Sequence, residues 1–73
     1  MGTAKERERR LREIPEMIRK SGGTTNFIAL WKDVAVPWSV TRIKLWEYLA
    51  TLNDAGVIKI ETGREDAPIS LII

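Results

Sequence analysis

The longest amphipathic pattern in the chain extends from Ser39 to Gly56. At about 100° per residue, its large apolar side chains gather on one half of a helical cylinder and most polar ones on the other. The apolar half consists of Leu45, Trp46, Leu49, Ala50 and Leu52, with Ile43 at its border. The polar half consists of Thr41, Lys44, Glu47, Tyr48, Thr51 and Asp54. Ser39 provides a side-chain cap, and Gly56 suits the left-handed residue after a helix end. The pattern predicts a helix over 39–55 with one face in a core.

Alternating β-branched residues follow this helix directly. Residues 57–62 have the sequence Val-Ile-Lys-Ile-Glu-Thr, and residues 69–73 have the sequence Ile-Ser-Leu-Ile-Ile. Glycine, proline and charged residues at 63–68 separate the two runs. Two such runs on either side of a turn segment predict a β-hairpin. We expect Ile58 and Ile60 to face the same core as the helix.

The first twenty residues contain a second helical pattern. Thr3 and Glu6 have the spacing of a capping box, which satisfies two backbone amides at a helix start. Apolar side chains recur at helical spacing at Ala4, Leu11, Ile14 and Ile18. Pro15 interrupts the pattern, because proline lacks a backbone N–H and collides with the preceding turn. The apolar stripe keeps its phase across the proline, so we predict one helix over 4–20 that bends near Pro15. The alternative is a new helix that starts at Pro15.

A shorter apolar stripe lies between these two patterns. Thr24, Thr25 and Asn26 are candidates for its N-cap, because their side-chain oxygens accept hydrogen bonds from free backbone amides. The stripe consists of Phe27, Leu30, Trp31 and Val34, with Lys32 and Asp33 opposite. It predicts a helix over 27–35, followed by a connection at 36–38. We expect the three tryptophans, Trp31, Trp38 and Trp46, to lie in the core, with Trp38 partly exposed.

Length and composition restrict both fold and function. With 73 residues the chain forms one domain over 1–73, and domains of this size are marginally stable. The chain has no cysteine and no histidine, which removes thiolate metal sites, the usual general base and the commonest transition-metal ligand. The sequence contains no catalytic constellation and no glycine-rich phosphate loop. We therefore expect a protein that is not an enzyme and has no metal or cofactor site.

The apolar runs are short, and the charged residues are unevenly distributed. No apolar run approaches the ~20 residues that a membrane span needs, and the N-terminus is charged, so we expect a cytoplasmic protein. Residues 1–20 contain seven basic residues and four glutamates, whereas residues 21–73 contain five basic and six acidic residues. The net charge of +2 therefore comes from the first helix. Its charges also pair with one another four positions apart, which is typical of a solvated helix face. That face is the alternative to a contact with phosphates or with a second chain.

The order helix, helix, turn, helix and hairpin is that of a known family. The segment Leu49-x-x-Leu52-x-x-x-Gly56-Val57-Ile58 resembles the recognition helix and wing of winged helix-turn-helix domains. The resemblance covers roughly residues 11–73, and small regulators of this kind occur in archaea and their viruses. It implies an α+β fold with three helices followed by a C-terminal β-hairpin wing. The turn between the second and third helices has Val-Pro-Trp where the family usually has glycine.

The resemblance implies a transcriptional regulator that binds double-stranded DNA as a homodimer. Its third helix would lie in the major groove, where base edges present a distinctive pattern of donors and acceptors. The residues implied to face the groove are Ser39, Thr41, Arg42, Lys44 and Tyr48. The hairpin tip at 63–68 would touch a phosphate or the minor groove through Arg64. The first helix would supply the dimer contact, through Leu11, Ile14 and Ile18 or through its N-terminal half.

A protein-interaction module is the alternative function. Winged-helix domains also join replication, transcription or membrane-remodelling complexes without reading a DNA sequence. The near-neutral charge of residues 21–73 favours this alternative. The apolar run from Ile69 to Ile73 would then add a strand to the sheet of a partner.

Overall fold

The helices and strands follow one another in the predicted order, with one additional short strand. The computed structural model describes residues 4–72, so the predicted capping residue Thr3 lies outside the described part. The elements are α1 (Ala4–Lys20), β1 (Thr24–Thr25), α2 (Phe27–Leu30), the π-helical turn η1 (Trp31–Ala35), α3 (Val36–Trp38), α4 (Arg42–Asp54), β2 (Ile58–Ile60) and β3 (Ile69–Leu71). The fold is therefore α+β, as predicted.

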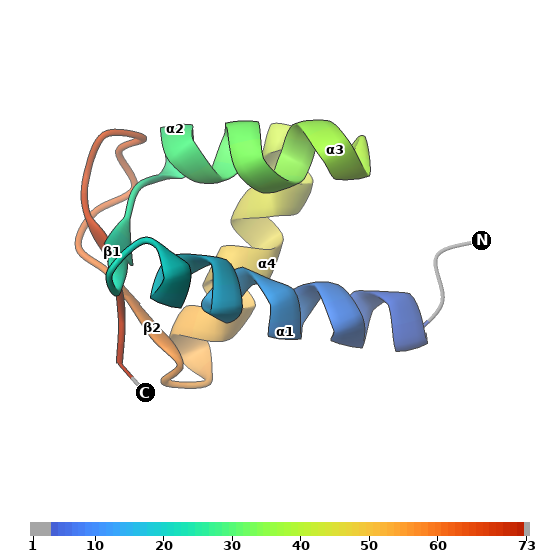
Figure 1. The fold of residues 1–73 in the computed structure, drawn as a ribbon, viewed down its shortest axis with the longest axis horizontal. Helices are drawn as coiled ribbons and strands as arrows, with labels where there is room; N and C mark the ends of the chain where they lie inside the picture. The colour runs from blue at the N-terminus through green and yellow to red at the C-terminus, as the bar shows by residue number, and fades with distance from the viewer. Residues whose placement is uncertain (1–3, 73) are drawn as a thin grey trace.

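The helices form a layered group with the sheet at one end. Figure 1 shows α1 and the helical segment from α2 to α3 on the near side, with α4 crossing behind them. The sheet lies at the end of the molecule where α1 finishes and α2 begins. The loop that joins β2 to β3 extends from the sheet toward the start of α2. This loop therefore lies beside the helices instead of projecting away from them.

The sheet consists of three antiparallel strands in the order β1-β3-β2. β2 pairs with β3, with Ile58 opposite Leu71, which confirms the predicted hairpin. Thr25 of β1 pairs with Ile69 on the other side of β3. β3 is therefore the central strand. The prediction that the run beginning at Ile69 offers a free sheet edge is wrong, because both of its neighbours are already in place.

The second helix is longer than predicted, because helical backbone continues through α2, η1 and α3. Its N-cap is Asn26, whose Oδ1 accepts a hydrogen bond from the backbone N–H of Ala29 at 2.8 Å. The π-helical turn interrupts the α-helical ladder, and α3 starts directly after it with Pro37 in its first turn. Proline is tolerated there because the first turn of a helix does not use that backbone N–H. The predicted connection at 36–38 is therefore helical.

The connection between α3 and α4 consists of residues 39–41. Ser39 has a left-handed backbone, with φ 56° and ψ 39°. The Thr41 side chain accepts a hydrogen bond from the backbone N–H of Lys44 at 3.1 Å. Thr41 is thus the N-cap of α4, and the predicted cap at Ser39 is wrong.

The apolar stripes of the helices and the sheet share one core. Pro15 lies within α1, which is a single helix as predicted. The buried side chains of the core are Ile14, Ile18, Phe27, Leu30, Val34, Ala35, Leu45, Tyr48, Leu49, Leu52, Ile58 and Ile69. The three tryptophans are half-buried and pack against this core. Ala50, which the helical pattern placed on the apolar side of α4, is exposed.

The left-handed backbone of Ser39 makes this position sensitive to side-chain shape. A β-branched residue is strongly disfavoured at positive φ, whereas glycine adopts it readily. We expect Ser39→Val to lower the free energy of unfolding by about 1 kcal/mol. Ser39→Gly, the matched control, is expected to leave it unchanged or slightly raised. Urea unfolding followed by tryptophan fluorescence measures both variants, and equal losses for the two would contradict the expectation.

Candidate nucleic-acid interface

The first turns of α4 form an exposed ridge. Leu45, Leu49 and Leu52 anchor the helix in the core, so the opposite side of its N-terminal half faces outward. The residues of this α4 ridge are Thr41, Arg42, Ile43, Lys44 and Glu47, all of them exposed. Ile43 is 74% exposed, the highest value among the large apolar side chains of the described residues. Of the residues predicted to face a DNA groove, Thr41, Arg42 and Lys44 lie on this ridge, and Ser39 is exposed just before it.

Tyr48 does not belong to the exposed ridge. Its side chain is 2% exposed, so the prediction that it faces outward is wrong. The reason is that α1 covers this side of α4, where the Tyr48 hydroxyl accepts a hydrogen bond from Nη1 of Arg10 at 3.2 Å. The polar end of the tyrosine thereby has a partner within the fold, which makes its burial acceptable. The ammonium group of Lys44 lies 5.5 Å from the centre of the Tyr48 ring, at the edge of the ridge.

Arg42 connects the start of α4 with the hairpin loop. Its guanidinium forms an ion pair with the carboxylate of Glu65. It also lies 5.5 Å from the ring centre of Trp31 and 6.0 Å from that of Phe27. Phe27 in turn stacks on Trp46, with ring centres 4.3 Å apart and planes 9° apart. Aromatic faces attract a guanidinium, so this cluster fixes where the Arg42 side chain lies.

The hairpin tip lies against the helices and carries its own ion pair. The backbone carbonyl of Glu65 accepts a hydrogen bond from the N–H of Ile28, the second residue of α2, at 3.4 Å. Arg64, the predicted phosphate contact, is paired with Asp66 at 3.2 Å. Arg64 is exposed, but its charge is balanced by the neighbouring residue of the same loop.

Every cation of α4 and the hairpin has an acidic partner within the described residues. Besides Arg42–Glu65 and Arg64–Asp66, the pairs are Lys44–Glu47 at 3.5 Å and Lys59–Glu61 at 3.7 Å. All of these side chains are more than a third exposed. Exposed ion pairs contribute about 0–1 kcal/mol each, so an incoming anion can replace the acidic partner at low cost. The surface is nevertheless close to electrically neutral.

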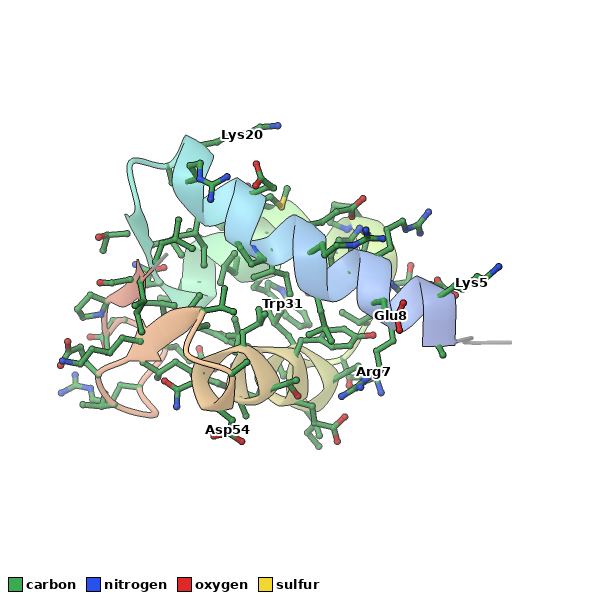
Figure 2. All side chains as sticks on the ribbon, turned by 90° about the horizontal axis from the view of Figure 1, so that it is seen from below. Lys5, Arg7, Glu8, Lys20, Trp31 and Asp54 are labelled. Carbon is green, nitrogen blue, oxygen red and sulfur yellow. The ribbon has the colours of Figure 1, made fainter. Side chains whose placement is uncertain are left out.

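The charged side chains of α1 have two different roles. Lys5, Arg9, Arg12 and Lys20 are exposed and form no ion pair with other residues of the range 4–72. Figure 2 shows Lys20 pointing away from α4, and Arg7 pointing toward it. Arg7 donates a hydrogen bond to the Thr51 hydroxyl at 3.4 Å. The N-terminal helix thus presents free positive charge on its outer side and contacts α4 on its inner side.

Arg10 is the inner cation and joins three helices. Its Nη2 pairs with Glu6 at 2.6 Å, and its guanidinium lies 5.4 Å from the ring centre of Trp38. The hydrogen bond to the Tyr48 hydroxyl raises the pKa of Arg10 above its ordinary value, and the Glu6 carboxylate acts in the same direction. No local pattern indicates this role, because Arg10 differs from the neighbouring arginines only in the residues that pack against it.

The predicted dimer residues divide into two groups. Ile14 and Ile18 are completely buried in the core of their own chain, so the prediction that they contact a second chain is wrong. The apolar stripe of α1 that was predicted to contact a second chain packs into the core of its own chain instead. Leu11 is half-buried and lines an open groove of about 540 Å³ between α1 and the end of α4.

Three further findings concern the relation of the chain to known proteins, metal binding and membranes. Comparison of the chain with protein-family models, with curated proteins and with solved structures finds no match. Residues 4–72 contain no group of three or more metal-binding side chains that could hold a metal ion. None of the helices in the same range is both long and apolar enough to cross a membrane.

Proposed function

We propose that the chain binds double-stranded DNA, with α4 in the major groove. The observation that carries this proposal is the exposed α4 ridge, which presents Thr41, Arg42 and Lys44 from a helix that is capped at its N-terminus and anchored in the core. An α-helix of this kind fits the major groove of B-form DNA. The order of the elements and the pairing of β3 between β1 and β2 are compatible with a winged helix-turn-helix arrangement. A role in transcription is what the resemblance to that family implies.

DNA binding requires the cations of the ridge to exchange partners. Arg42 would leave Glu65, and Lys44 would leave Glu47, for phosphate oxygens or base edges. Because both ion pairs are exposed, the exchange costs little free energy. Arg64 would likewise leave Asp66 for a phosphate oxygen if the hairpin tip approaches the DNA backbone. The free cations of α1 add long-range attraction, which raises the association rate at low salt.

The proposal predicts that Lys44 contributes directly to DNA affinity. We expect Lys44→Glu to weaken binding to a random duplex about tenfold, because one phosphate contact is lost and one negative charge is added. The measurement is fluorescence anisotropy with a labelled duplex of about 20 base pairs, at salt concentrations from about 20 to about 200 mM. Wild-type affinity should fall steeply as the salt concentration rises.

The matched control is Lys20→Glu, which makes the same charge change at the end of α1. Lys20 points away from α4 (Figure 2), so its replacement should weaken binding much less than that of Lys44. Equal effects of the two variants would mean that only the net charge matters, and the assignment of α4 to the groove would be lost. No binding of the wild type at the lowest salt concentration would end the proposal.

A second candidate function is a protein-interaction module that uses the same ridge. Two observations favour it: the complete ion pairing of the cations on α4 and the hairpin, and the exposure of Ile43 at the centre of the ridge. Addition of a strand by a partner is less suitable than the sequence indicated. On β2, an outer strand of the sheet, the N–H of Ile60 already donates a hydrogen bond to the Asn53 side chain at 3.2 Å. Absence of duplex binding at low salt would select this candidate.

A further inference from the structure

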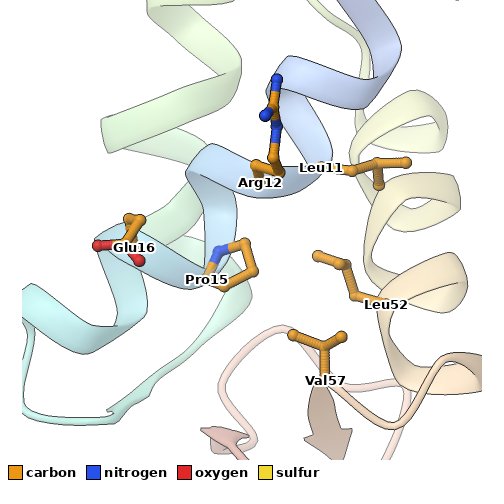
Figure 3. A pocket seen from close by; sticks show the side chains of 6 residues that line it. All are labelled: Leu11, Arg12, Pro15, Glu16, Leu52 and Val57. Carbon is orange, nitrogen blue, oxygen red and sulfur yellow. The ribbon is translucent and has the colours of Figure 1, made fainter. Parts of the chain in front are cut away.

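An apolar groove lies on the side of the molecule away from the α4 ridge. Figure 3 shows Pro15 of α1, Leu52 of α4 and Val57 at the start of the hairpin pointing toward the space between these elements. The groove holds about 540 Å³ and is lined by Leu11, Arg12, Pro15, Glu16, Leu52 and Val57. Its floor is apolar, and within the described range the charged residues that line it are Arg12 and Glu16 on α1. A surface of this kind is a candidate contact for another protein.

The hairpin extends this apolar surface. The carbonyl of Val57 accepts a hydrogen bond from the N–H of Ile72 at 2.9 Å, which continues the register of β2 and β3 by one position. Residues paired in this way place their side chains on the same face of an antiparallel ladder. Ile72 is 58% exposed. An unpartnered isoleucine therefore stands beside Val57 at the end of the groove.

The charged residues along the groove side of α1 alternate in sign. Glu8, Arg12, Glu16 and Arg19 follow one another at intervals of four, four and three residues, and all four are exposed. Such intervals keep side chains on one stripe of a helix. When a second copy of the stripe runs antiparallel with Arg12 opposite Glu16 of the other copy, Glu8 lies one residue out of register with Arg19, close enough for the two side chains to meet. The stripe is therefore complementary to itself, which is the condition for a two-fold symmetric interface.

We propose that the groove is the interface of a homodimer, in which α1 packs antiparallel to α1 of the second copy. The apolar contact is made by Leu11, Pro15, Leu52, Val57 and Ile72, and Arg12 and Glu16 form ion pairs between the chains. Ile14 and Ile18 remain in the core of their own chain. Within a single chain, Arg19 pairs with Glu16 at 2.5 Å, and both side chains are exposed. In the dimer the Glu16 carboxylate also binds Arg12 of the other copy. The proposal does not depend on DNA binding, since the α4 ridge is not part of the interface.

The experiment measures the mass of the protein by light scattering after size exclusion, at protein concentrations from about 10 μM to about 1 mM. A monomer has a mass of 8.3 kDa, and a dimer has twice that mass. The wild type is expected to dimerise within this range. Arg12→Glu and Glu16→Arg each place like charges opposite one another in the symmetric dimer, and each is expected to raise the dissociation constant about tenfold or more.

Mixing the two single variants is the decisive step. A chain with Arg12→Glu carries two acids at these positions, and a chain with Glu16→Arg carries two bases, so a heterodimer restores both ion pairs. The mixture is expected to dimerise with a dissociation constant within about threefold of the wild-type value. An effect on helix stability alone gives no such recovery, because stability within each chain is unchanged by mixing.

The matched control uses Lys44→Glu and Glu47→Arg, an exposed basic and acidic pair on the α4 ridge, which is not part of the interface. Neither change should alter the dimer, and their mixture should behave as its components do. Ile72→Asp, outside α1, tests the apolar contact separately and should weaken the dimer about tenfold. A wild type that stays monomeric at every concentration overturns the proposal, as does a dimer that the variants at Arg12, Glu16 and Ile72 leave intact or that mixing fails to restore. Circular dichroism confirms that each variant is folded.

Discussion

Ile14→Ala is expected to lower the free energy of unfolding by about 3 kcal/mol. The Ile14 side chain has no exposed surface, and the rigid core around it cannot close the cavity that alanine leaves. A 73-residue domain typically has a total stability of about 4–11 kcal/mol. The expected loss is therefore a large part of the total stability, and the melting temperature of the variant should fall.

Urea unfolding followed by tryptophan fluorescence measures this loss. Because Ile14 belongs to the core of a single chain, the difference between variant and wild type should be the same at low and at high protein concentration. Leu11→Ala is the contrasting variant, because Leu11 is only half-buried and its loss should be about 1 kcal/mol at low protein concentration, where the chain is monomeric. If Ile14→Ala lowered the free energy of unfolding only at concentrations where the protein is dimeric, Ile14 would belong to the dimer interface and not to the core.

Arg10→Met is expected to lower the free energy of unfolding by about 2 kcal/mol. Methionine keeps the apolar stem of the side chain but loses the bonds to Glu6 and Tyr48 and the contact with Trp38. Tyr48→Phe should cost about 1 kcal/mol, and the double variant should cost less than the sum of the two, because both single changes break the same hydrogen bond. A coupling energy near zero would show that the bond does not contribute in solution.

Arg9→Met is the matched control for Arg10→Met. Arg9 is exposed and forms no ion pair with other described residues, so its replacement should change stability by less than about 0.5 kcal/mol. The contribution of Arg10 should also be constant around neutral pH. Its pKa is raised in the folded state, so the stabilisation is complete below the unfolded pKa and is lost only in strongly alkaline solution.

The sequence was sufficient for the elements whose signals are local. Leu45, Leu49 and Leu52 recur at helical spacing and are buried as that spacing predicts. The alternation around Ile58 predicted a strand, and its pairing with β3 confirms the hairpin. These features depend on residues close together in the chain, where periodicity alone decides which side chain faces the core.

The features that the sequence did not reveal depend on distant partners. β1 consists of only Thr24 and Thr25, and it is a strand because β3 lies beside it. Tyr48 was assigned to the polar side of its helix, since a helical wheel does not show that α1 covers that side as well. Glu65 is 23 residues from Arg42, and no local pattern connects them.

The same limit applies to the candidate surfaces. Exposure of Thr41 and Lys44 followed from the periodicity of α4, but the neutral charge balance of the ridge and hairpin depends on ion pairs that only the fold brings together. Leu11 was predicted to be a dimer contact, but no groove beside α1 was predicted. The groove has no local signal, because Leu52 and Val57 reach it from a distant part of the chain.

Glu65 is attached to two helices at once. Its carboxylate binds Arg42 at the start of α4, and its backbone carbonyl binds the amide of Ile28 in α2. A ligand that binds Arg42 would therefore release one of these two contacts, and the hydrogen bond to Ile28 would remain between Glu65 and the helices. Binding of a ligand at the start of α4 would in this way loosen the loop between β2 and β3, which lies 23 residues further along the chain.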